Sequence, residues 1–179
     1  MKWVAIIGVA IAALVAVVVI IGLVLPRDHV ASVTAKIAAP PAAVWAAIVQ
    51  PEAFPTWRGD VSRVEMLTST ANGPSWREHT RNGALTMGVE QSDPPRRVVT
   101  RILDQNLPYG GTWEYDIAPD GASDSRVTIT ERGWVSNPIF RFVSRSIMGH
   151  TSSMETYLRS LGKHFGGEPT PIVAATDGA

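Results

Sequence analysis

An uninterrupted apolar segment at the N-terminus constrains this chain more than any other feature. Residues 3–25, WVAIIGVAIAALVAVVVIIGLVL, contain no charged, hydroxyl or amide side chain. As a helix rising about 1.5 Å per residue, this segment would reach roughly 34 Å, enough to cross a hydrocarbon core about 30 Å thick. A helix of this length in a soluble core would carry a polar stripe, and this segment has none. We therefore predict a transmembrane anchor over residues 1–26.

A cleaved secretory signal is the main alternative to an anchor. The apolar core of such a signal is usually about 7–15 residues long, with a small-residue cleavage site close behind it. Here Pro26-Arg27-Asp28 follows, and the nearest suitable site, Val33-Thr34-Ala35, lies too far downstream. A single-pass anchor is therefore favoured. Lys2 and the free amine on one side nearly balance Arg27 and Lys36 on the other, with a slight lean to an extracytoplasmic domain.

The composition argues against several classes of function. The chain has 16 basic and 16 acidic residues and no dense basic patch, so nucleic-acid binding is not predicted. Its four histidines lack metal-ligand spacing, and no metal or other cofactor is predicted. Cysteine is absent and no Gly-x-Ser-x-Gly motif occurs, which argues against two common kinds of nucleophile.

Beyond the anchor, the pattern predicts one α+β domain over residues 27–166. Residues 30–38 alternate apolar and polar side chains, as a half-buried strand does. The paired prolines at 40–41 then open a helix, and a second short helical piece follows over residues 51–57. From residue 61 short strands alternate with turn signals such as Asn82-Gly83, which predicts an antiparallel meander.

The last predicted element is a helix over residues 137–165. Asn137 can cap it, Pro138 fits its first position, and Gly166 can end it. Its apolar stripe is interrupted by GHTSS at residues 149–153. Either the helix breaks there, or it covers a space that is not solid core. Residues 167–179, rich in Pro, Ala, Thr and Gly, are expected to form a disordered tail.

Three segments resemble a known family. VTAKIAAPPAAVWAAI is similar to its first strand and helix, EQSDPPRRVVTRI to a turn between strands, and RVTITERGWVSNPIFRFVSR to its last strand and helix start. Over about residues 30–165 the chain resembles the START-like (SRPBCC) superfamily, which holds polyketide cyclase/dehydrases and lipid-transfer domains. The resemblance implies a helix-grip fold: a curved antiparallel sheet of about seven strands around a long C-terminal helix, with two short helices after the first strand.

In that fold a cavity separates the sheet from the helix, which offers one explanation for the interrupted stripe. With the stripe centred on Ile147, His150 and Thr151 would both face the sheet without filling volume as leucine would. A hollow beneath them is the interpretation we favour. The alternative is a kink at Gly149 with His150 in an ordinary core.

Alternation along the strands predicts which other side chains face the cavity. Trp76 and Glu78 share one face of their strand, as do Ile129 and Glu131. The predicted ligand cavity is lined by Trp57, Trp76, Glu78, Met87, Trp113, Tyr115, Ile129, Ile147, His150, Thr151 and Met154. An inward carboxylate would pair with an arginine or hold a polar end of a ligand, unless it lies at the rim in water.

Anchor and resemblance together suggest a membrane-tethered module that binds a lipid or another hydrophobic small molecule. The alternative is a cyclase/dehydratase-like enzyme with Glu78, Glu131 or His150 as acid and base. A third possibility is an interaction module whose own side chains fill the cavity. Arg141, Arg145 and Arg159 are predicted to lie on a solvated helix face. The sequence identifies no protein partner.

Overall fold

The computed structural model describes residues 2–149 and 151–174, except for the side chains of residues 147 and 148. The helices are α1 (Lys2–Val24), α2 (Pro41–Ile48), η1 (Pro51–Ala53), α3 (Phe54–Trp57), α4 (Pro138–Val143), η2 (Ser144–Met148) and α5 (Ser152–His164). The strands are β1 (Asp28–Ile37), β2 (Val61–Thr70), β3 (Gly73–Thr80), β4 (Gly83–Asp93), β5 (Arg97–Ile102), β6 (Tyr109–Asp120), β7 (Asp124–Val135) and β8 (Ile172–Val173). Within the described residues α1 alone is long and apolar enough to cross a membrane.

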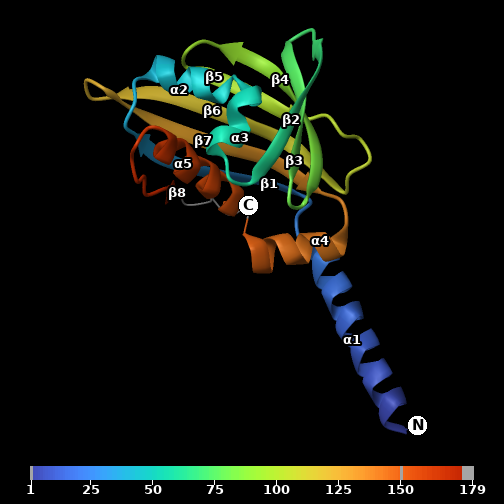
Figure 1. Cartoon of the computed structure of the whole chain (residues 1–179). Coiled ribbons are helices and arrows are strands. Elements are labelled where there is room, and N and C mark those ends of the chain that lie inside the picture. The colour runs from blue at the N-terminus through green and yellow to red at the C-terminus, as the bar shows by residue number, and fades with distance from the viewer. Residues whose placement is uncertain (1, 150, 175–179) are drawn as a thin grey trace.

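All strands belong to one antiparallel sheet in the order β2-β3-β4-β5-β6-β7-β1-β8. The sheet curves behind α2, α3 and α5 (Figure 1). Its order confirms the predicted α+β meander and the two short helices after the first strand. In β1 the predicted inward face is buried, with Val33 and Ile37 both 0% exposed.

The core lies between the sheet and α5. Met154, Leu158 and Leu161 of α5 are each 0% exposed and recur at the three- and four-residue spacing of one helix face. They pack with the inward residues of β1 and β7 in one hydrophobic cluster. This cluster fixes the position of α5 against the sheet.

The single helix predicted over residues 137–165 is wrong in one respect, because the structure divides it. Asn137 caps its start as predicted, with Oδ1 accepting from the backbone N–H of Ile139 at 2.9 Å. After η2, Gly149 adopts φ +71°, a conformation that glycine reaches without strain. A new helix, α5, then begins at Ser152. The kink at Gly149 is therefore the alternative that the structure supports.

The tail also differs from its prediction. Residues 172–173 form β8, where Val173 pairs with Val33, and the N–H of Ala174 donates to the carbonyl of Ser32 at 3.0 Å. An uncovered edge strand presents unpaired backbone groups, and β8 pairs with the part of this edge at Ser32 to Thr34. The expected disorder is therefore wrong for residues 172–174, while residues 175–179 lie outside the described chain.

Candidate functional site

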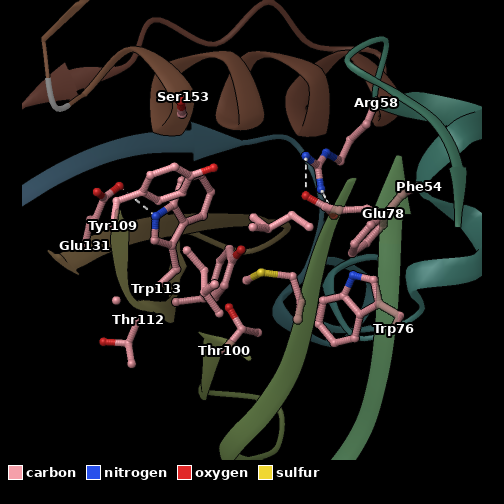
Figure 2. Close-up of a pocket in the computed structure, with 15 residues that line it drawn as sticks. Phe54, Arg58, Trp76, Glu78, Thr100, Tyr109, Thr112, Trp113, Glu131 and Ser153 are labelled. Carbon is pink, nitrogen blue, oxygen red and sulfur yellow. Dashed lines mark hydrogen bonds and ion pairs between the residues drawn. The ribbon is translucent and has the colours of Figure 1, made fainter. Parts of the chain in front are cut away.

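A cavity of about 230 Å³ lies between the sheet and helices α3 and α5. Strands β3 to β7 supply most of its wall, and Ser153 of α5 covers one end (Figure 2). The wall is mostly aromatic and aliphatic, with three charged side chains. Its lining residues are Phe54, Arg58, Trp76, Glu78, Leu85, Met87, Thr100, Ile102, Tyr109, Gly111, Thr112, Trp113, Tyr115, Glu131 and Ser153.

Five of the six strand residues predicted for the cavity lie in its wall. These are Trp76, Glu78, Met87, Trp113 and Tyr115. Alternation explains the result, because residues two apart on one strand point to the same face of the sheet. The candidate acid Glu131, directly opposite Trp113 across β6 and β7, lines the same cavity.

The other predicted residues do not line it. Ile129 and Met154 are 0% exposed and pack in the solid core. Trp57 stacks edge-on against Tyr157 at 5.3 Å between ring centroids. The Thr151 hydroxyl donates to Oε1 of Glu155 at 2.9 Å.

The predicted hollow beneath residues 150 and 151 is therefore not where the structure has its cavity. The kink at Gly149 changes the helical phase, so that Ser153 and not Thr151 reaches the space. The side chain of Ile147 and all of His150 lie outside the described residues.

One end of the cavity holds a buried ion pair. Arg58 Nη1 donates to Glu78 Oε2 at 3.0 Å, and Arg58 Nη2 donates to Asp60 Oδ2 at 2.7 Å. Arg58 and Glu78 are each 8% exposed. Burial acts to lower the pKa of Arg58, but the Glu78 carboxylate, the hydrogen-bonded Asp60 and the nearby Tyr157 together outweigh it and leave that pKa above its ordinary value. Glu78 thus has an arginine partner, one of the alternatives open from sequence, though the sequence did not identify Arg58.

A second carboxylate lies at the opposite end (Figure 2). Trp113 Nε1 donates to Glu131 Oε2 at 2.7 Å, and His29 Nε2 lies 2.9 Å from Glu131 Oε1. Sequence reasoning missed His29, because it lies between the predicted anchor and the predicted strand over residues 30–38. Identifying His29 would have required the pairing of β1 with β7, which sets His29 opposite Gly133 and close to Glu131.

Between these ends the wall offers little polarity. The hydroxyl of Thr100 and the indole N–H of Trp76 are buried and have no hydrogen-bond partner in the described structure. Burial raises the pKa of Tyr115 and Tyr157 above the usual range, so both phenols are neutral at physiological pH. The arrangement suits a ligand with an apolar body, because the charged groups of the wall lie only at the two ends of the cavity.

Comparisons with known proteins agree with this architecture. Residues 28–165 match the family model described as polyketide cyclase/dehydrase and lipid transport. No curated protein matches the sequence. The match begins at β1 and leaves α1 outside it.

Solved structures share the fold at low identity. A START superfamily protein from Mycobacterium smegmatis is 15% identical over 77% of this chain and 97% of that chain, with a TM-score of 0.63. The Zhui aromatase/cyclase from Streptomyces sp. R1128 is 14% identical over 78% and 94%, also at 0.63. Norcoclaurine synthase from Thalictrum flavum is 12% identical over 81% and 90%, at 0.62. The chain therefore belongs to the polyketide cyclase/dehydrase and lipid transport family and has its START-like helix-grip fold.

Proposed function

We propose that this protein is a membrane-anchored module that binds a small hydrophobic molecule in the cavity under α5. The observation that carries the proposal is the apolar wall between Arg58 and Glu131. The carboxylates of Glu78 and Glu131 already accept hydrogen bonds from protein side chains. A ligand therefore gains most by burying apolar surface, at roughly 25 cal/mol per Å².

The size of the cavity narrows the ligand class. At about 230 Å³ it is smaller than the roughly 300–1,000 Å³ of pockets for drug-sized ligands. A molecule of one or two rings, or one end of a longer chain, suits this volume. A complete two-chain lipid would need the cavity to widen.

The anchor supports a ligand that dissolves in the bilayer. Tyr109, at the rim of the cavity, is 39% exposed and pairs with Val135. The N–H of Val135 donates at 2.9 Å to the carbonyl of Arg27, three residues after α1 ends. Since neighbouring strands lie about 4.8 Å apart, the rim is roughly 10 Å from the chain leaving α1.

Binding can be tested with the full chain in detergent micelles. A fluorescent probe with a single apolar ring system should bind the unaltered chain and be displaced by small isoprenoid or aromatic compounds. Met87→Trp adds an indole to the cavity wall and should weaken probe binding at least tenfold. The matched control, Leu67→Trp, adds the same ring at a site that is 40% exposed and outside the lining. Equal binding by both variants would overturn the proposal.

An enzyme of the cyclase/dehydratase type is the second candidate, favoured by one observation. The Glu131 carboxylate lines the cavity and lies 2.9 Å from an imidazole nitrogen of His29, close enough to exchange a proton. Glu131→Gln keeps the shape of the side chain but removes its basicity. It should abolish turnover of a poly-β-ketone substrate and leave binding nearly unchanged. Absence of turnover by the unaltered chain would remove this candidate and leave the binding proposal intact.

A further inference from the structure

Helix α4 is apolar around nearly its whole circumference, yet it is not buried. Its sequence is PIFRFV, in which Arg141 is the single polar residue. Ile139 is 43% exposed and Phe140 is 51% exposed. A helix that is apolar on all sides is normally buried in a core or a membrane. The exposed surface of Ile139 and Phe140 is therefore suited to an apolar environment.

The structure fixes α4 directly to the end of α1. Gly22 is the one buried residue described in α1, and a Cβ atom there would overlap the carbonyl group of Pro138. Arg141 Nη1 donates to the carbonyls of Gly22 at 3.2 Å and Leu25 at 3.1 Å. The last carbonyls of a helix have no partner within it, so Arg141 satisfies groups that would be costly to leave unpaired in an apolar medium.

This contact corrects the prediction that Arg141 lies on a solvated face. Arg145 and Arg159 are exposed as predicted, but Arg141 is half-buried and holds α1 and α4 together. In Figure 1, α4 lies across the upper end of α1, between α1 and the rest of the domain. If α1 spans a bilayer, α4 lies at the level of its surface.

Groups typical of a membrane interface surround the same junction. The Arg27 guanidinium lies over the ring of Trp134, 5.1 Å from its centroid, and tryptophan and arginine are common at this depth. Residues 138–148 contain Arg141 and Arg145 and no acidic residue. This charge favours anionic headgroups and disfavours a symmetric contact of the surface with a second copy.

We propose that α4 lies in the interfacial layer of the bilayer that α1 enters, with Ile139 and Phe140 among the acyl chains. The inference rests on the anchor in the proposed function and adds a second, oriented contact with the membrane. Because Arg141 joins α4 to α1, the domain is held in one orientation. Tyr109 at the cavity rim then faces the lipid surface, from which a hydrophobic ligand would enter.

The absence of cysteine allows single-site spin labelling of the full chain in lipid vesicles. Phe140→Cys places the label on α4. Ala122→Cys is the control, in the exposed turn at the far end of the β6–β7 hairpin. We expect the Phe140 label to be relaxed strongly by oxygen and weakly by a water-soluble nickel chelate. The Ala122 label should show the reverse.

Two other outcomes would overturn the proposal. A Phe140 label as accessible to the nickel chelate as the Ala122 label would place α4 in water. A label protected from both reagents would place it against protein, such as a second copy of this chain. Probe binding by both cysteine variants in detergent is measured in parallel. If the variants still bind the probe but the Phe140 label is exposed to water, only the membrane contact of α4 is contradicted. The proposed function then stands.

A second pair of variants tests the junction. Gly22→Leu inserts a side chain where the carbonyl of Pro138 lies, so it should displace α4 and make the Phe140 label more accessible to the chelate. Gly8→Leu adds the same side chain to α1 at a site with no neighbouring atom within 4 Å. It should leave the label unchanged. An equal response to both variants would show that the α1–α4 contact does not position α4.

Discussion

At the residue scale, the buried pair of Arg58 and Glu78 is the most consequential polar contact in the cavity wall. Both side chains are nearly inaccessible to water, and Arg58 Nη1 lies 3.0 Å from Glu78 Oε2. Removing one partner of such a pair leaves an uncompensated buried charge. Its integrity therefore matters for stability as well as for the shape of the cavity.

We expect Arg58→Met to destabilise the full chain by about 3–5 kcal/mol, because Glu78 is left buried without a cation. The double variant Arg58→Met/Glu78→Leu should recover much of this loss, since it removes both charges. Arg97→Met is the control. It breaks an ion pair with Glu114 in which Arg97 is 46% exposed, and should cost less than about 1 kcal/mol. Chemical unfolding in detergent measures all three, and equal losses for the two single variants would contradict the argument.

The tyrosines provide a pH-dependent prediction. The chain has three, and burial raises the pKa of Tyr115 and Tyr157. A raised folded-state pKa means that the folded protein retains the proton longer than the unfolded chain. The associated stability is complete below the unfolded pKa of about 10 and is lost as pH rises above it. Tyrosinate absorbance should therefore show incomplete ionisation until alkaline unfolding. Ionisation of all three before unfolding would contradict the burial of these phenols.

At the element scale, β8 converts a segment expected to be disordered into an edge that covers β1. The pairing is short. Ile172 lies opposite Thr34, Val173 lies opposite Val33, and the N–H of Ala174 donates to the carbonyl of Ser32. The ring of Pro169 also packs where a side chain at Gly162 of α5 would lie. The tail thus connects the sheet edge with the core helix.

Deleting residues 169–179 should expose the outer edge of β1. We expect faster amide hydrogen exchange in β1 and more self-association, because an uncovered edge strand can pair with another chain. Deletion of residues 175–179 alone, which retains β8, is the control. Unchanged exchange in β1 after the longer deletion would mean that β8 does not protect this edge.

At the scale of the whole molecule, the junction with α4 joins α1 to the rest of the domain. The nearly balanced charges at the two ends of α1 lean slightly toward an extracytoplasmic domain. A membrane-impermeant maleimide should therefore label Ala122→Cys in intact cells. A cysteine placed at Lys2 should be labelled only after permeabilisation. The reverse pattern would place the domain in the cytoplasm.

The local features of this protein could be predicted from its sequence. Alternation in residues 30–38 and 76–80 specified which side chains face inward, and the apolar run specified a long N-terminal helix, because these patterns depend on neighbours along the chain. The START-like resemblance supplied the helix-grip topology. Which side chains meet across that topology could be seen only in the folded chain. Arg58, just after α3, reaches Glu78 on β3. His29 on β1 reaches Glu131 on β7, and Arg141 reaches the carbonyl of Gly22 in α1. Such contacts join residues 20, 102 and 119 positions apart, where no local pattern indicates which pairs will form. The sequence likewise predicted Thr151 at the cavity, whereas Ser153 lines it, because the kink at Gly149 changes the helical phase.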